Sequence, residues 1–156
     1  MKQITVDLLL CPVCHGDLAL DISHGNEIVE TGSLTCSVCH KIYSVQRGIP
    51  HFIREDELEG LNKTFAHMYD WFSWIYSAFS QIGFLLLGTT NSSAWREVLS
   101  WLEPNGGKVL EVSIGSGVNL PFLLSSPTVS EVYGLDISIG QLNRCNTLIH
   151  RKGWSV

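Results

Sequence analysis

Two pairs of cysteines constrain most strongly what this chain can fold into. Cys11-Pro12-Val13-Cys14 and Cys36-Ser37-Val38-Cys39 each place two thiols three residues apart, and 21 residues separate the pairs. Two ligands at this spacing form a tight knuckle that aims both sulfurs at one metal ion, and two knuckles complete the tetrahedron that zinc accepts from thiolates. Because a closed four-sulfur shell leaves no open coordination position, the pattern predicts a structural zinc ion.

Other uses of paired cysteines are less consistent with this sequence. His15 and His40 follow the two pairs, which gives twice the attachment signature of c-type haem. Haem attachment requires export, and the apolar run Leu8–Leu10 is too short for a secretory signal. A thioredoxin-like redox pair would need a βαβ pattern around it, which neither pair has. We therefore interpret both histidines as surface residues beside the knuckles, and we expect the reducing cytoplasm, where paired cysteines act as metal ligands.

Composition excludes one further class of protein and disfavours another. The chain has 156 residues and a formal charge of −5, with 45% hydrophobic and 16% charged residues. This much apolar mass excludes a disordered acidic tail. The first 60 residues hold nine acidic against four basic side chains, and no basic stripe follows. The sequence therefore carries no strong nucleic-acid signal.

The cysteine pairs lie among turn signals and short segments of β character. We expect strands at about Glu27–Thr31, Leu34–Cys36 and Ile42–Val45, which predicts a small β-rich zinc ribbon over residues 1–56. Four stretches resemble the zinc-ribbon family that includes the activator subunit of tRNA and protein methyltransferases: Cys-Pro-Val-Cys-His-Gly-Asp-Leu, Leu-Thr-Cys-Ser-Val-Cys, Tyr43-Ser44-Val45 and Gly48-Ile49-Pro50. The resemblance covers about residues 6–53. Members of that family often act as methyltransferase partners, so the resemblance is compatible with a methyltransferase fused to the ribbon.

Residues 57–104 are expected to form a helical lid or linker segment. Apolar side chains recur there at spacings of three and four, as in an amphipathic helix: Phe65, Met68, Phe72, Ile75 and Phe79. No formal charge lies between Trp71 and Trp95, but serine, glutamine and glycine interrupt the run, whereas a membrane span needs ~20 mainly apolar residues. We therefore expect a buried or lid helix and no transmembrane span.

The last third of the chain has an alternating strand and helix pattern. Ser92 or Ser93 is expected to cap a helix over Ala94–Leu102. Strands are then expected at Lys108–Val112 and Val129–Leu135, and helices at about Asn119–Leu124 and Gly140–Arg151. This order predicts parallel strands and an α/β fold for residues 105–156.

Two motifs in this region resemble those of class I S-adenosylmethionine-dependent methyltransferases. Val109–Gly117 resembles the first motif, and Gly134–Ser138 resembles the second. The resemblance implies that Glu111 lies near the methionine end of S-adenosylmethionine, that Gly115 and Gly117 lie under the cofactor, and that Asp136 binds the ribose. Gly115 and Asp136 are 21 residues apart, close to the ~20 of such sites. Ser113 replaces the first glycine of the family motif, and a serine fits there if its φ is negative.

The aromatic stretch His67–Tyr76 resembles the helix that precedes the first motif in quinone-biosynthesis and phospholipid-type methyltransferases. Such helices cover the cofactor, and the resemblance implies Tyr69 as a contact. Simple core packing by the aromatic stripe is the alternative for any single residue in it.

These resemblances together imply an incomplete Rossmann-like methyltransferase sheet with a helical lid, preceded by the ribbon. The two expected strands are too few for such a sheet, so we expect a truncated product, a fragment, or a partner chain that completes it. The predicted function is a methyltransferase that uses S-adenosylmethionine on a small or apolar acceptor, with no catalytic residue identified. Two alternatives stay open: a non-enzymatic zinc-ribbon module that activates a separate methyltransferase, and an RNA methyltransferase.

Overall fold

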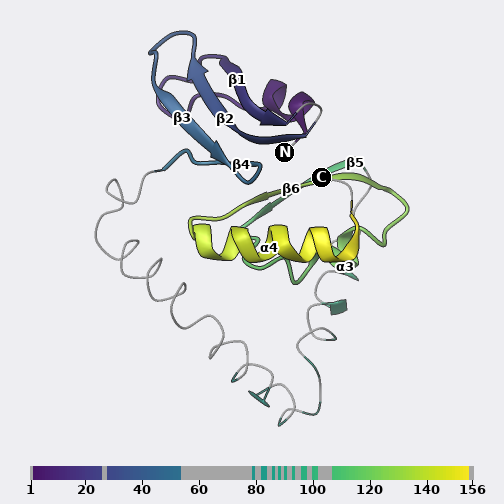
Figure 1. Cartoon of the computed structure of the whole chain (residues 1–156). Coiled ribbons are helices and arrows are strands. Elements are labelled where there is room, and N and C mark those ends of the chain that lie inside the picture. Colours follow the sequence, from purple (N-terminus) through teal and green to yellow (C-terminus); the bar gives the residue numbers. More distant parts are fainter. Residues whose placement is uncertain are drawn as a thin grey trace. The chain divides into compact units, whose positions relative to one another are not determined.

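The computed structural model describes residues 2–25, 28–53 and 107–154, together with isolated residues between 79 and 101. The chain divides into two units near Glu59 and Gly60. Figure 1 shows a β-rich unit at the N-terminal end of the sequence and an α/β unit at the C-terminal end. This confirms a mixed α/β chain with a β-rich N-terminal region. The three-part division at residues 56 and 104 stays a prediction.

The first unit is a four-stranded antiparallel sheet with one short 3-10 helix. The elements are η1 (Gln3–Leu8), β1 (Leu18–Gly25), β2 (Val29–Cys36), β3 (Ile42–Gln46) and β4 (Ile49–Pro50), and the strand order is β1-β2-β3-β4 (Figure 1). The single strand β2 includes residues 29–31 and 34–36 of the two segments that were expected as separate strands. The prediction missed β1, although the alternation of Leu18, Leu20 and Ile22 is a signal for a half-buried strand.

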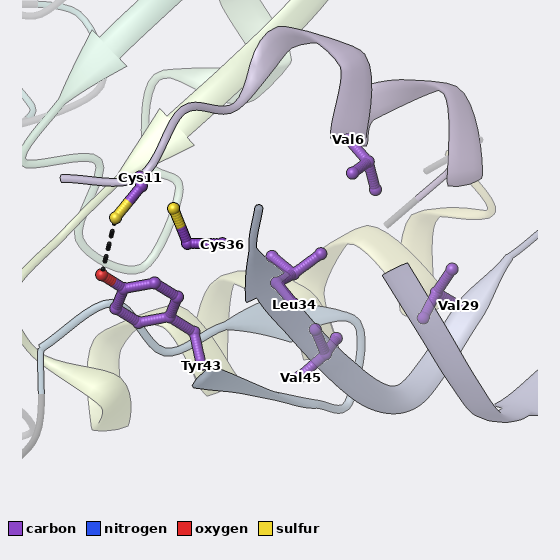
Figure 2. Close-up of a cluster of buried hydrophobic side chains, with 7 residues drawn as sticks. All are labelled: Val6, Cys11, Val29, Leu34, Cys36, Tyr43 and Val45. Carbon is purple, nitrogen blue, oxygen red and sulfur yellow. Dashed lines mark hydrogen bonds between the residues drawn. The ribbon is translucent and has the colours of Figure 1, made fainter. Parts of the chain in front are cut away.

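Seven buried residues form the core of this unit. They are Val6, Cys11, Val29, Leu34, Cys36, Tyr43 and Val45 (Figure 2). Strand β3 shows why these residues reach the core. Burial alternates along it: Tyr43 and Val45 are buried, whereas Ile42 and Ser44 are exposed. Successive side chains of a strand point to opposite faces, so alternate residues reach the core. Two of the seven are cysteines, which makes the predicted metal ligands part of the core.

The second unit contains one pair of parallel strands among its described residues. β5 (Gly107–Val112) and β6 (Val129–Leu135) pair in parallel, and α3 (Leu120–Leu123) and α4 (Ile139–Lys152) accompany them. The parallel pairing and the bounds of β6 are confirmed. β5 begins one residue earlier than expected, α3 is shorter, and α4 extends one residue further at each end. A larger Rossmann-like sheet stays a prediction.

Local interactions fix both ends of α4. Ser138 is the N-cap, and its hydroxyl accepts the backbone N–H of Gln141 at 3.1 Å. Gly153 ends the helix with φ +66, the left-handed conformation that glycine adopts at little cost. Basic residues occupy the last turn, where they complement the negative end of the helix dipole. Because Asp136 precedes the N-cap by two residues, this cap also fixes the chain at the end of β6.

Most of the predicted lid segment, including Tyr69, lies outside the described residues. Ser93 is described and is helical, and the Thr90 hydroxyl accepts its N–H at 3.1 Å. Among the described residues the capping side chain is therefore Thr90 and not Ser93, while Ser92 lies outside them. Within the part of the chain that the structure describes, no helix is long and apolar enough to cross a membrane.

Candidate metal centre and strand-edge site

The four cysteines of the first unit converge on one point. Their sulfur atoms all lie within 4.8 Å of one another. The sulfurs of Cys11 and Cys39 are 3.6 Å apart, and those of Cys14 and Cys36 are 3.4 Å apart, so each close pair joins the two knuckles. All four are free thiols, since a disulfide would bring the sulfurs to about 2.05 Å.

The two knuckles have the same backbone construction. The N–H of Cys11 donates to Gly16 and the N–H of His15 donates back to Cys11, while Cys36 donates to Lys41 and His40 donates back to Cys36. His15 and His40 have φ of +59° and +58°, so both turn the chain in the left-handed region just after the second cysteine. Both side chains are exposed, as expected.

Gly16 allows the knuckles to approach each other. A Cβ at this position would lie 2.7 Å from a methyl group of Val38 and 3.2 Å from the Cys36 sulfur. The first contact would force the Val38 side chain to move, and the second would press on the Cys36 sulfur. Glycine here is therefore a packing requirement of the four-cysteine site.

This arrangement fits a tetrahedral zinc ion. With Zn–S bonds of ~2.3 Å, the sulfurs of a tetrahedron are ~3.8 Å apart. The Cys14–Cys36 and Cys11–Cys39 sulfur separations of 3.4 and 3.6 Å need only small adjustments to reach that value. When bound, the ion would cross-link η1–β1 and β2–β3 and stabilise the fold. The convergence of both pairs on one point also favours a single ion over two haem groups.

Hydrogen bonds favour the thiolate form of the two buried cysteines. Burial by itself raises the pKa of Cys11, but hydrogen bonds from the Tyr43 hydroxyl and from backbone N–H groups lower it to about 6. The pKa of Cys36 is also lowered, chiefly by the backbone N–H of Cys39, although burial opposes this. Metal binding requires deprotonated cysteine, so these donors prepare the site for a cation. Tyr43 belongs to a stretch that resembles the zinc-ribbon family, but the sequence did not predict that its hydroxyl lies in this site.

The second unit brings together most of the residues predicted to bind the cofactor. Glu111 is the penultimate residue of β5 and pairs with Gly134 of the parallel strand β6, and Asp136 directly follows β6. The Asp136 carboxylate accepts the N–H of Gly115 at 2.8 Å and that of Ser138 at 2.9 Å. The glycine-rich loop and the end of β6 are therefore joined directly at the carboxyl edge of the sheet.

Three residues of the loop have left-handed backbone conformations. Gly115 and Gly117 have φ of +57° and +79°, as the glycine motif predicts. A Cβ at Gly117 would also lie 2.8 Å from the Cys145 sulfur. Ser113 has φ +61°, so the condition under which a serine fits this position, a negative φ, is not met. The first position of the motif needs glycine geometry even though this chain has serine there.

Two buried acceptors lie beside this edge. Asn119 donates to one oxygen of Glu111 at 2.6 Å. The other Glu111 oxygen and the Asn119 amide oxygen are buried and have no hydrogen-bond partner among the described residues. Burial raises the pKa of Glu111 and, together with Glu111 and Asp136, raises that of Cys145 to about 11. The sequence reasoning missed Asn119, which stands two residues after the last glycine of the motif.

Comparisons with known proteins identify the first unit. Residues 2–48 match the family model described as Trm112p-like protein. A curated relative, the UPF0434 protein of Blochmanniella pennsylvanica (strain BPEN), is 30% identical over 56 residues, which span 36% of this chain and 89% of the relative. The chain belongs to the Trm112p-like family.

The chain is also similar to a chain in a solved complex. That complex joins the Haloferax volcanii Trm112 methyltransferase activator to a protein described as a methyltransferase. The identity is 27%, and the match covers 36% of this chain and 98% of the matched chain. Its TM-score of 0.33 is too low to show a shared fold over the whole chain.

Family membership corrects the predicted activity. Trm112-like proteins are activator modules for methyltransferases and not catalysts themselves, so the prediction that this chain is a methyltransferase enzyme is wrong. The resemblance of two short motifs misled the prediction because such motifs describe a strand edge and not a complete active site. The zinc-ribbon and metal-binding predictions for residues 1–56 are supported by the match and by the four-cysteine cluster.

Proposed function

We propose that this chain is a non-enzymatic activator module that binds a separate methyltransferase and raises its activity. The observation that carries the proposal is the Trm112p-like match over residues 2–48, within which all four cysteines converge on one point. The chemistry then belongs to the partner, as does the choice of methyl acceptor. The reducing cytoplasm predicted from the cysteines is consistent with such a module.

The knuckle tips are the surface that we propose for docking. Val13 and Val38 each stand directly before the second cysteine of a pair, and their side chains are 60% and 66% exposed. Val38 also packs over Gly16 of the other knuckle, so the tip of the second knuckle lies against the first. Exposed apolar groups held in place by a rigid site are suited to burial in a protein interface.

The test measures methyl transfer by a reconstituted pair. The tagged full chain is used to capture proteins from a lysate of its source, and each captured methyltransferase is then produced alone. Transfer of labelled methyl from S-adenosylmethionine is measured for the chain alone, the enzyme alone and the mixture. We expect no turnover by the chain and a higher turnover by the mixture than by the enzyme. Turnover by the isolated chain, or no stimulation of any captured methyltransferase, would contradict the proposal.

Matched substitutions test the surface. We expect Val13→Asp and Val38→Asp to weaken binding of the enzyme by at least tenfold, because each places a charge in an apolar contact. Ile28→Asp is the control, since Ile28 is 47% exposed but precedes β2 at the end opposite Cys36. Equal effects of all three changes would show that the knuckle tips do not dock the partner.

We also propose that the β5–β6 edge binds S-adenosylmethionine within such an assembly, through Glu111, Ser113, Gly115, Gly117 and Asp136, with Tyr69 as a further contact. The fixed Asp136 carboxylate retains lone pairs for ribose hydroxyls, and the unpaired Glu111 oxygen suits the cationic end of the ligand. Calorimetric titration of the full chain, with and without the partner enzyme, measures this. Asp136→Ala should abolish any binding. Identical heats for this variant and the wild type would reject the assignment.

A further inference from the structure

The Tyr43 hydroxyl contacts the sulfur of Cys11, one of the four predicted metal ligands. Its oxygen is 3.2 Å from the Cys11 sulfur, and the two side chains are 3% and 0% exposed (Figure 2). Tyr43 comes from β3, whereas Cys11 comes from the segment between η1 and β1. The contact therefore joins the sheet to the first knuckle across 32 residues of sequence.

The direction of this hydrogen bond follows from metal chemistry. Cysteine binds zinc as the thiolate, which has no proton to donate. With metal bound, the tyrosine O–H is therefore the donor and the sulfur is the acceptor. A buried tyrosine hydroxyl needs a partner, and the low dielectric of the interior strengthens the bond.

Packing keeps the hydroxyl in this position. The Tyr43 ring meets the Phe52 ring edge to face, with centroids 5.2 Å apart and planes inclined by 63°. The Lys41 ammonium lies over the Tyr43 ring, 6.0 Å from its centroid. On the neighbouring strand, Leu34 is the register partner of Tyr43. A ring held by these contacts presents the hydroxyl to the sulfur without a large entropy cost.

We propose that Tyr43 is a positioning residue of the metal centre, which holds the Cys11 thiolate by an outer-sphere hydrogen bond and slows loss of the ion. The inference rests on the four-cysteine zinc site. Hydrogen bonds to metal ligands typically change metal affinity by about 10–100-fold. The hydroxyl also takes electron density from the sulfur, which alters the metal–thiolate charge-transfer energy. Together, the release rate and the charge-transfer energy distinguish a hydrogen bond to the Cys11 thiolate from a purely packing role of Tyr43.

The experiment compares zinc release and cobalt spectra of full-length variants. Tyr43→Phe removes the hydroxyl and keeps the ring against Phe52. Zinc transfer from the loaded chain to a chromogenic chelator gives the release rate, and the charge-transfer band of the Co²⁺-loaded chain reports on the thiolates. Tyr133→Phe is the matched control, because it removes a hydroxyl that bonds Glu131 in the second unit. Val45→Ala lowers the stability of the same core without touching a ligand.

We expect Tyr43→Phe to release zinc about tenfold faster than the wild type and to shift the cobalt band, by loss of one outer-sphere bond. Tyr133→Phe should change neither readout. Val45→Ala is expected to lower the unfolding temperature and leave the band unchanged. Release within twofold of the wild type with an unshifted band would overturn the role of Tyr43 alone. Failure of the wild type to bind about one equivalent of zinc would overturn the metal site itself.

Discussion

Ser113→Gly should stabilise the second unit, because the wild-type serine has an unfavourable backbone conformation. Its φ is +61°, in the left-handed region that residues with a Cβ rarely adopt. For an ordinary L-residue this conformation costs about 1–2 kcal/mol. Glycine removes that cost. The substitution therefore relieves strain in the loop between β5 and α3.

The net increase in the free energy of unfolding is smaller than the strain energy that glycine removes. A glycine gains conformational freedom in the unfolded chain, which offsets about 0.4–1 kcal/mol. The difference leaves a stabilisation of roughly 0.5–1 kcal/mol. For a unit of this size, each kcal/mol raises the unfolding temperature by about 4–8 °C, so the expected rise is about 2–8 °C.

Thermal unfolding followed by helical circular dichroism measures this, since α4 is the longest helix that the structure describes. Ser116→Gly is the control in the same loop. The φ of Ser116 is not in the left-handed region, so the change adds only unfolded-state freedom and should lower the transition temperature. The reasoning is refuted if Ser113→Gly lowers the temperature, or if the two variants shift it alike.

Four further outcomes are expected. Leu34→Ala, at a fully buried position, should destabilise the first unit by about 3–4 kcal/mol, measured by urea unfolding of the zinc-loaded chain. Gly117→Ala should destabilise the second unit more than Gly115→Ala, because only the former meets atoms within 4 Å; thermal unfolding ranks them. Glu111→Gln should raise the unfolding temperature at pH 7 but not at pH 4. Burial raises the pKa of Glu111 in the folded chain, so the charged carboxylate lowers stability at pH 7 and the protonated form at low pH does not. Glutamine is uncharged at both pH values. A strong chelator should unfold the first unit and leave the helical signal of α4, and an unchanged β signal would contradict a structural metal.

The sequence predicted those features that local patterns determine. The spacing within each pair predicted the two knuckles, and the preference of zinc for four thiolate ligands predicted that the knuckles meet at one point. The bounds of β6 and the parallel pairing followed from a short apolar run between two helical patterns. The Gly115 and Gly117 conformations followed from the motif itself.

Other features depend on contacts that no local pattern records. β1 was missed because its alternation of Leu18, Leu20 and Ile22 lies among turn residues and becomes a strand by pairing with β2. The contact of Tyr43 with Cys11 was missed because the two residues are 32 positions apart in the sequence. The left-handed φ of Ser113 was missed because the residue type alone argues against it, and the hydrogen bond from Ile114 to Leu135 that ties the loop to β6 appears only in three dimensions.

Under the proposed activator function, the residues of the docking surface lie in the same two knuckles that would bind the metal ion. Val13 and Val38 each stand between two cysteines of a knuckle, so neither tip can move far while the sulfurs hold an ion. The ion itself is enclosed by four ligands and offers no open position for chemistry. Zinc would therefore influence a partner methyltransferase through the shape of the knuckle tips, and Tyr43 would contribute by keeping that shape connected to the sheet. A Trm112p-like ribbon can thus serve catalysis without a catalytic residue of its own.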